Sequence, residues 1–312
     1  MKIQFWGVRG SIPAPLTPQQ IQSKIIAAVQ RITPKDIENS DSRERFISSL
    51  PSWIFGTTGG NTPCTVITDG PTKIILDMGS GLRAYGKSQG CLEGLRKYHI
   101  FSSHFHWDHI HGLPFFDPAF MKDSEIHFYS PFPKAKQILQ NQMKRPYFPV
   151  PFEAFTENFN FHLLKPRKSI ELEGFTVNWC TMAHPGNSFA YSFEKDGKKF
   201  VYATDVELRT VDFVKDERTM PVFENADCIV VDSQYTVEEA CRKVNWGHSA
   251  FCYAIDFAVH WNIKELYLFH HEPTYDDKKL RSILQAARWY AQYIEHSDIE
   301  ILISKEDEEV YL

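Results

Sequence analysis

One short segment constrains the fold more than any other part of the chain: it reads His104-Phe105-His106-Trp107-Asp108-His109. It directly follows the apolar segment 98–103, which is typical of a buried strand. His104 and His106 alternate as residues do at a strand end, so both rings are expected on one side. Asp108 and His109 follow where the chain must turn, and they can face a second point. Imidazole and carboxylate groups suit Zn²⁺ and related ions, so the segment predicts two adjacent divalent metals.

Strand and helix patterns alternate along the rest of the chain. Short apolar runs bounded by Gly, Asn or Pro predict strands at 2–8, 64–68, 73–77, 98–102, 125–129, 175–180, 188–194, 199–204, 227–232, 265–269 and 299–303. Apolar residues at helical spacing predict helices at 42–50, 132–144, 236–243, 249–261 and 276–295. This order of elements predicts an α/β (α+β) fold in which helices cover β-sheets.

Residues 16–55 are predicted to form a helical insertion. Thr17 offers an N-cap, Pro18 stands at the first helical position, and Gln20 completes a capping box. One apolar face then follows, made of Ile21, Ile25, Ile26, Val29 and Ile32. The insertion separates two turn segments, 7–11 and 59–62, that otherwise look like neighbours in one hairpin. It can be a decorative excursion, a lid or a contact in a homodimer.

Composition excludes several classes of protein. The chain has 312 residues, 43% of them hydrophobic, which is enough for a large core. The net charge of −5 argues against an extended basic surface for nucleic acid. The six cysteines form no CxxC pair, and most lie in apolar runs, which is typical of buried free thiols in a reducing compartment. With no signal-like or membrane-length segment, we expect a cytoplasmic location and no membrane partner.

Two metals need more ligands than the segment 104–109 supplies. Three candidates stand at the ends of predicted strands: His184, Asp205 and His270. Ligands often cluster where strand ends meet one edge of a sheet, although a single His or Asp there is often only a turn residue.

The motifs together resemble a metallo-β-lactamase-fold hydrolase. The resemblance is to the phosphodiesterase branch with ribonuclease Z, cyclic-nucleotide phosphodiesterases and phosphoribosyl cyclic phosphate phosphodiesterase. It rests on segments 7–13, 59–62, 76–79, 104–109, 183–185, 203–205, 246–249 and 268–271, which span nearly the whole chain. The resemblance implies a four-layer αββα sandwich, here as a single domain over residues 1–312, with the metals at one edge of the sheets.

The resemblance also implies roles for individual residues. The first metal would be held by His104, His106 and His184, the second by Asp108, His109 and His270, and Asp205 would bridge them. His270 is preferred to His271 because the family's ligand stands directly at the strand end. Asp77 would orient the metal loop, while Arg9 and Asn61 are weak candidates for substrate contact. Zn²⁺ is the expected metal, with Mn²⁺ or Fe²⁺ as alternatives.

The expected activity is hydrolysis of a small cyclic or linear phosphodiester, or another nucleotide-like substrate. Asp108 takes part as a metal ligand, and two ions can hold a bridging hydroxide as nucleophile. His248 resembles the family's general acid, and Asp232 is a weaker candidate to orient it. The segment 147–152 is interpreted as a hydrophobic wall over the site. Alternatives are a tRNA 3′-processing endonuclease, an ester, thioester or lactone hydrolase, and a non-catalytic metal-containing sensor.

Overall fold

The computed structural model describes residues 1–90 and 96–312, and it contains two seven-stranded sheets. The first sheet contains, in spatial order, β14 (Glu309–Tyr311), β1 (Lys2–Gly7), β2 (Cys64–Asp69), β3 (Thr72–Leu76), β4 (Arg96–Phe101), β5 (Ser124–Ser130) and β6 (Phe159–Leu163). The second contains β13 (Glu300–Ile303), β12 (Glu265–Phe269), β11 (Cys228–Asp232), β10 (Lys198–Ala203), β9 (Ser188–Lys195), β8 (Phe175–Met182) and β7 (Ile170–Leu172).

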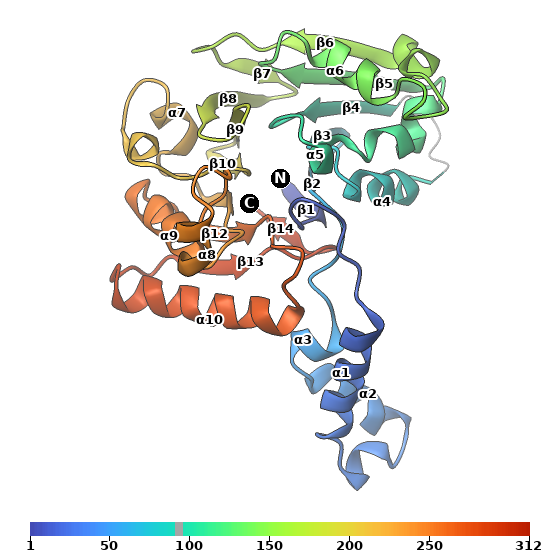
Figure 1. Ribbon diagram of the computed structural model, residues 1–312, viewed down its shortest axis with the longest axis vertical. Coiled ribbons are helices and arrows are strands. Elements are labelled where there is room, and N and C mark those ends of the chain that lie inside the picture. The colour runs from blue at the N-terminus through green and yellow to red at the C-terminus, as the bar shows by residue number, and fades with distance from the viewer. Residues whose placement is uncertain (91–95) are drawn as a thin grey trace.

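Helices cover the outer faces of both sheets (Figure 1). Beside the first sheet lie α4 (Gly81–Ser88), α5 (Trp107–Ile110), α6 (Ala135–Gln142) and the short 3₁₀ turns Leu113–Phe115, Asp117–Phe120 and Phe152–Asn158. Beside the second lie α7 (Met220–Phe223), α8 (Val237–Arg242), α9 (Phe251–His260), α10 (Asp277–Tyr293) and the turn Thr210–Phe213. The layers therefore run helix, sheet, sheet, helix, as the resemblance implied.

Three apolar clusters hold these layers together. One contains Phe5, Phe193 and Tyr202 and lies between the two sheets. A second packs α9 and α10 on the outer face of the second sheet, with Trp261 fully buried. The third packs α4 and its following turns on the first sheet through Tyr98 and neighbours. Burial of apolar surface on both faces of each sheet is the main force that fixes this stacking.

The sheet topology brings many strand ends to one edge. Strands β10, β11, β12 and β13 are parallel, and β3, β4, β5 and β6 are parallel in the other sheet. Strand β8 runs antiparallel to β9, which runs antiparallel to β10, so β8 and β10 point the same way. The predicted metal ligands, together with Asp77 and Asp232, lie at or just after the ends of β3, β4, β8, β10, β11 and β12.

All eleven predicted strands are present, but β6, β7 and β14 were missed. The acidic residues 306–309, which look like a solvated loop in the sequence, are anchored at both ends. Glu306 accepts hydrogen bonds from Asn61, and Glu309 begins β14, which pairs with β1. Helix α4 was also missed, because its sequence includes Gly81 and Gly86 and glycine weakens the helical signal.

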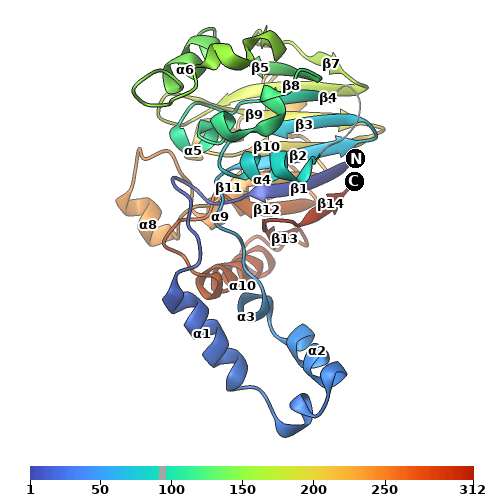
Figure 2. The ribbon, with the colours of Figure 1, turned by 90° about the vertical axis from the view of Figure 1, so that its right-hand side faces the viewer.

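A helical arm projects from the two-sheet body (Figures 1 and 2). It contains α1 (Pro18–Val29), the 3₁₀ turn Pro34–Ile37, α2 (Ser40–Ser49) and α3 (Ser52–Phe55). The capping box at Thr17 and Gln20 is formed as predicted. The turn segments on either side of the arm are paired, since the amides of Val8 and Arg9 both donate to the carbonyl of Asn61.

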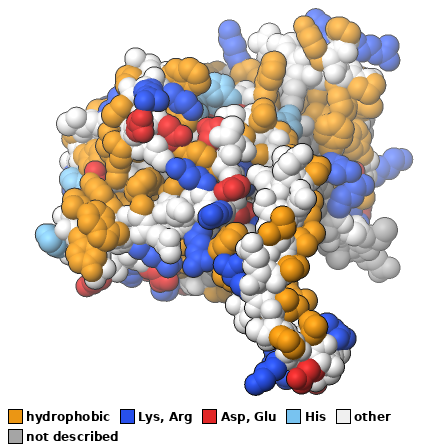
Figure 3. All heavy atoms as spheres, turned by 60° about the horizontal axis from the view of Figure 1, so that its bottom comes forward, with side chains coloured by type: hydrophobic (Ala, Val, Ile, Leu, Met, Phe, Trp, Pro, Cys, Tyr) orange, Lys and Arg blue, Asp and Glu red, His pale blue; other side chains and the backbone are white. Residues whose placement is uncertain are grey.

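The apolar face of α1 is not buried by the rest of the chain. Ile21, Ile25, Ile26 and Val29 are 47%, 58%, 48% and 62% exposed, and α1 contains no buried residue. Hydrophobic side chains follow the length of the arm on the face seen in Figure 3. An apolar stripe at helical spacing normally packs against a partner, so this face is available for one.

Four of the five described cysteines are buried, and all five are free: Cys64, Cys180, Cys228, Cys241 and Cys252. Cys241 is the exposed one, and Cys91 lies outside the described residues. Burial raises the pKa of the buried thiols, which leaves them protonated and unreactive. Of the helices in residues 1–90 and 96–312, none is long and apolar enough to cross a membrane.

Candidate metal centre

Seven side chains from four segments converge at the shared edge of the two sheets. They are His104, His106, Asp108 and His109 after β4, His184 after β8, Asp205 after β10, and His270 directly after β12. These are the seven residues that the sequence singled out, and they form two overlapping groups. In each group the candidate ligand atoms lie within 4.8 Å of one another.

The first group contains His104, His106, His184 and Asp205. The Nε2 of His184 lies 3.0 Å from Nδ1 of His106. Oδ2 of Asp205 lies 3.5 Å from Nε2 of His104 and 3.8 Å from Nε2 of His184. Three imidazoles and one carboxylate oxygen thus surround one point, which is a typical ligand set for a divalent metal.

The second group contains Asp108, His109, Asp205 and His270. Oδ1 of Asp205 lies 3.1 Å from Nε2 of His109 and 3.1 Å from Nε2 of His270. Oδ2 of Asp108 lies 3.2 Å from the same His270 nitrogen. Asp205 therefore turns one carboxylate oxygen toward each group, which is the placement of a bridging ligand.

Hydrogen bonds from outside the groups fix which ring nitrogen faces inward. The Nδ1 atoms contact oxygens as follows: His109 with Asp77 at 2.8 Å, His184 with the Gly247 carbonyl at 2.8 Å, and His270 with Oε1 of Gln234 at 3.3 Å. Because these oxygens only accept, each Nδ1 carries the proton and donates it. Each Nε2 then presents its lone pair to the centre, as a metal ligand must.

Divalent ions fit the groups that these residues form. The Nε2 atoms of His109 and His270 face each other at 3.3 Å, where two lone pairs would repel unless a proton or a metal ion lies between them. The Nε2 of His104 is buried and has no hydrogen-bond partner among the described residues. Buried polar atoms are normally satisfied, so the unpaired acceptors and the inward lone pairs call for a cation.

The electrostatics of the centre also favour cations. Burial lowers the pKa of His104 far below its usual value, so its ring is neutral and free to bind a metal. Burial alone would raise the pKa of Asp205, but His109, His270 and His104 hold it well below its usual value. Burial opposes protonation of His109, yet three surrounding carboxylates raise its pKa strongly, so without metal a proton occupies the place at Nε2 that a bound cation would take. The same negative charge would attract divalent ions.

Unusual backbone conformations turn three of these strand ends toward the centre. Asp77, Asp205 and His270 adopt φ values of +61°, +54° and +60°. Residues other than glycine rarely occupy this left-handed region, and each instance costs on the order of 1 kcal/mol. At these three positions the left-handed backbone turns the side chain inward.

Asp77 lies behind the centre, where it supports the candidate ligand His109. Its side chain is fully buried and accepts hydrogen bonds from the amide and the hydroxyl of Ser103, both at 2.7 Å. The Tyr202 hydroxyl donates to it at 3.0 Å, and His109 donates from Nδ1 at 2.8 Å. The structure therefore places Asp77 where it orients the loop that carries His109.

His248 lies beside the second group and is held by Asp232. Its Nδ1 lies 2.7 Å from Oδ2 of Asp232, and its ring stacks on His270 with the ring centroids 4.9 Å apart. Burial opposes protonation of His248, but Asp232 and the carboxylates of the centre raise its pKa to about 9. The structure thus brings His248 and Asp232 together beside the candidate ligands.

The choice between His270 and His271 is resolved by their contacts. His271 points away from the groups, and its Nε2 lies 3.0 Å from the Ser304 carbonyl, to which it donates. Burial and the nearby Arg9 lower the pKa of His271 to about 3. His270, at the strand end, faces the centre as expected.

The structure does not support the suggested substrate contacts of Arg9 and Asn61. The buried Arg9 guanidinium donates to the carbonyls of Gly59, Glu272 and Tyr275. The Asn61 side chain donates to Glu306 and accepts from Ser80. Both side chains connect loops and strands, because their polar atoms already have protein partners.

Two contacts to the centre were not foreseen from the sequence. The backbone amide of Ser11 donates to Oδ2 of Asp108 at 2.8 Å, and Gln234 positions His270. A main-chain donor has no sequence signal, and a lone glutamine in a loop has none either. The predicted wall at 147–152 is correct only in part, since Tyr147 lines a cavity beside the centre whereas Phe152 is buried in the core.

Comparison with known proteins agrees with this architecture. A sequence profile described as the Beta-lactamase superfamily domain matches residues 72–271. No curated protein sequence matches significantly. Similar solved structures include the metallo-beta-lactamase fold protein YhfI from Bacillus subtilis, with 16% identity, a TM-score of 0.64 and coverage of 99% of each chain.

Two further structures are similar over nearly their full length. A diphosphatase from the PhnP family shares 14% identity at a TM-score of 0.64, covering 100% of this chain and 97% of that one. The short form of human tRNase Z shares 16% identity at a TM-score of 0.63, covering 100% and 99%. Such low identities show the fold alone. The profile spans well over half of the chain, and with the two-sheet sandwich it shows that the chain belongs to the β-lactamase superfamily, with a metallo-β-lactamase fold.

Proposed function

We propose that this protein is a di-metal hydrolase that cleaves a small cyclic or linear phosphodiester. The observation that carries the proposal is the pair of His/Asp groups that share Asp205, with His248 beside them. When bound, two divalent ions would polarise a phosphate group and favour deprotonation of water at neutral pH. Zn²⁺ suits the histidine-rich ligands best, and Mn²⁺ or Fe²⁺ are compatible with them.

His248 is proposed as the general acid. Asp232 accepts a hydrogen bond from Nδ1, which fixes the ring and leaves Nε2 as the nitrogen that can give a proton to a leaving alkoxide. A phosphodiester needs such a donor because an alkoxide is a poor leaving group. The same residue is less necessary for an ester or thioester, whose leaving group departs more easily.

Three further groups around the centre hold the candidate ligands in place. Asp77 orients His109, Gln234 orients His270, and the Ser11 amide fixes the Asp108 carboxylate. Such supports commonly change metal affinity by 10–100-fold when they are removed. Recognition of tRNA is not favoured, because the net charge of −5 offers no general attraction to phosphate backbones.

The proposal is tested by hydrolysis of bis(p-nitrophenyl) phosphate by the purified metal-loaded protein. We expect turnover in the wild type and none in the double variant Asp108→Ala/His109→Ala. A double variant that is as active as the wild type would refute the assignment of the centre. A metal-loaded wild type with no activity on this or any other phosphodiester, but with activity on a thioester, would refute the substrate class.

A further inference from the structure

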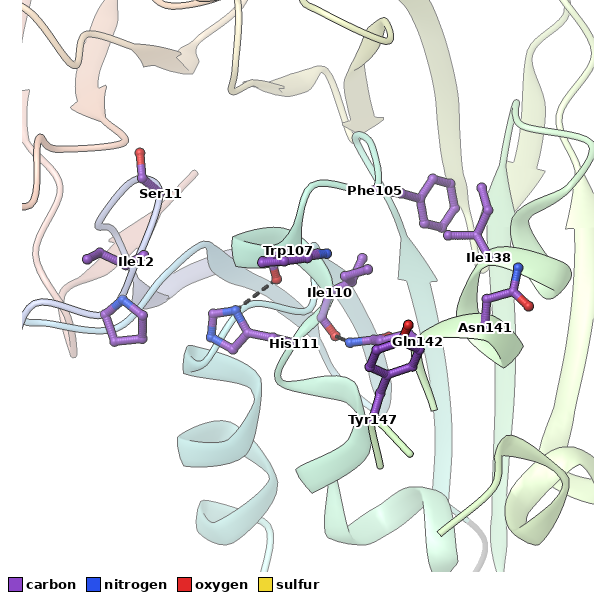
Figure 4. Close-up of a pocket in the computed structure, with 11 residues that line it drawn as sticks. Ser11, Ile12, Phe105, Trp107, Ile110, His111, Ile138, Asn141, Gln142 and Tyr147 are labelled. Atoms are coloured by element: carbon purple, nitrogen blue, oxygen red, sulfur yellow. Dashed lines mark hydrogen bonds between the residues drawn. The ribbon is translucent and has the colours of Figure 1, made fainter. Parts of the chain in front are cut away.

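A cavity of about 640 Å³ lies beside the candidate metal centre (Figure 4). Its walls come from the loop after β1, the segment that carries the metal ligands, and α6 with the residues that follow it. The lining residues are Ser11, Ile12, Pro13, Phe105, Trp107, Ile110, His111, Ile138, Asn141, Gln142 and Tyr147. The volume is within the range of pockets that take small ligands.

The cavity and the centre share structural elements. Trp107 stands in the chain between the candidate ligands His106 and Asp108, and Phe105 stands directly before His106. Ser11 lines the cavity while its backbone amide donates to Asp108. A substrate with its phosphate at the metals would therefore extend its next group toward this cavity.

The cavity wall carries no fixed charge of the common kinds. Among the described residues that line it, none is Lys, Arg, Asp or Glu. A second phosphate or a carboxylate would lose its hydration there without gaining a cationic partner, which is unfavourable. The wall therefore selects an uncharged group.

Two aromatic rings in this wall are left in solvent. Trp107 is 84% exposed and Tyr147 is 80% exposed, so neither contributes much to the core. Figure 4 shows both rings at the cavity, close to Ile110. Exposed aromatic surface beside an active centre is typical of a site that stacks on a planar ligand.

The amide of Gln142, in the same wall, is held by the protein itself. Nε2 of Gln142 donates to the carbonyl of Ile110 at 2.8 Å, which fixes the orientation of the amide. Its Oε1 is buried and has no hydrogen-bond partner among the described residues. Because this oxygen is not accessible from the cavity, Gln142 contributes a fixed, uncharged surface to the wall.

We propose that this cavity binds the nucleobase of a substrate that carries a single phosphate, with Trp107 as the stacking residue. This inference rests on the proposed phosphodiesterase function and narrows its substrate to a nucleotide. The phosphate lies at the metals, the uncharged base lies against Trp107, and no further anionic group is accommodated in the cavity.

The test compares inhibitors that differ only in the base. Adenosine 5′-monophosphate and ribose 5-phosphate are titrated against bis(p-nitrophenyl) phosphate hydrolysis. Base stacking predicts an inhibition constant roughly tenfold or more lower for the nucleotide in the wild type. We expect Trp107→Ala to bring the two constants within about threefold of each other, and Trp107→Phe to keep most of the difference. Adenosine 3′,5′-bisphosphate should inhibit no better than the monophosphate.

Trp289→Ala is the matched control, because Trp289 is exposed on α10 outside the cavity lining. It should leave the difference between the inhibitors unchanged. Equal constants for the two inhibitors in the wild type, or an undiminished difference in Trp107→Ala, would overturn the proposal. Calorimetric binding of both inhibitors to the metal-loaded protein gives the same comparison without turnover. Failure of the phosphodiesterase function and failure of the base site are therefore distinguishable.

Discussion

Replacement of Asp77 by asparagine tests how far the residues behind the centre control metal binding. In the wild type one Asp77 oxygen accepts from the Ser103 amide, and the other accepts from three donors that include Nδ1 of His109. Asparagine has the same shape and can keep its oxygen on the Ser103 amide. Its NH₂ group then faces His109, which can no longer donate from Nδ1.

The expected magnitude follows from these contacts. Two of the three donors are the hydroxyls of Ser103 and Tyr202, which can rotate and accept from the new amide. Only the His109 contact is lost outright, so we expect about 1.5–3 kcal/mol of destabilisation in the metal-free protein. If His109 changes tautomer to recover a bond, Nε2 carries the proton and ceases to be a ligand. Metal affinity should then fall by about 10–100-fold, or ~1.4–2.7 kcal/mol.

The assay is a competition titration of Zn²⁺ against a chromophoric chelator, with urea unfolding measured in parallel. Asp69→Asn is the control, because Asp69 is a half-exposed carboxylate at the end of β2 that pairs with Lys195. It should leave metal affinity unchanged. An Asp77→Asn variant that binds Zn²⁺ within about twofold of the wild type would refute the argument that this hydrogen bond fixes the ligand nitrogen.

Three further predictions concern the acid, the arm and a buried histidine. His248→Ala should reduce kcat for substrates with alkoxide leaving groups by about 10²–10⁴-fold but affect p-nitrophenyl esters far less; equal losses for both would exclude the general-acid role. We propose that the exposed face of α1 is a contact between two copies of the chain. Deletion of residues 16–55 should then convert a dimer to a monomer, as measured by light scattering, and leave the metal content intact. A change in KM without a change in oligomeric state would instead indicate a lid. The pKa of His271 is about 3 in the folded protein and about 6.5 in the unfolded chain. As the pH falls below about 6.5, only the unfolded chain takes up a proton at this position, so the free energy of unfolding decreases. Between pH 7 and pH 5, urea titrations should therefore show a decrease in the free energy of unfolding that is about 2 kcal/mol smaller for His271→Gln than for the wild type. An equal decrease in both proteins would contradict a pKa of about 3 for His271.

The sequence predicted which side chains meet at the centre, because the candidate ligands carry strong local signals. The segment 104–109 directly follows an apolar strand. His184, Asp205 and His270 each follow another apolar strand within two residues. Their meeting at one edge follows from the parallel strands. The support by Asp77 and the His248–Asp232 pair were anticipated only through the family resemblance.

Other features depend on tertiary contacts that leave no local pattern. The short strand β14 forms because β1 offers an open edge, and its three residues Glu309–Tyr311 are too few to show a strand pattern. The Arg9 side chain has its partners at Glu272 and Tyr275, far away in the sequence, so its buried role could not be seen. The same holds for the cavity, which combines residues from the loop after β1, α5 and α6.

The most direct test of the central claim is the metal content of the purified protein, measured by elemental analysis together with phosphodiester hydrolysis. The proposed function predicts two divalent ions per chain, loss of both metal and activity on chelation, and recovery when Zn²⁺ or Mn²⁺ is restored. A protein that binds no divalent metal, or that hydrolyses bis(p-nitrophenyl) phosphate equally well when stripped of metal, would contradict the account.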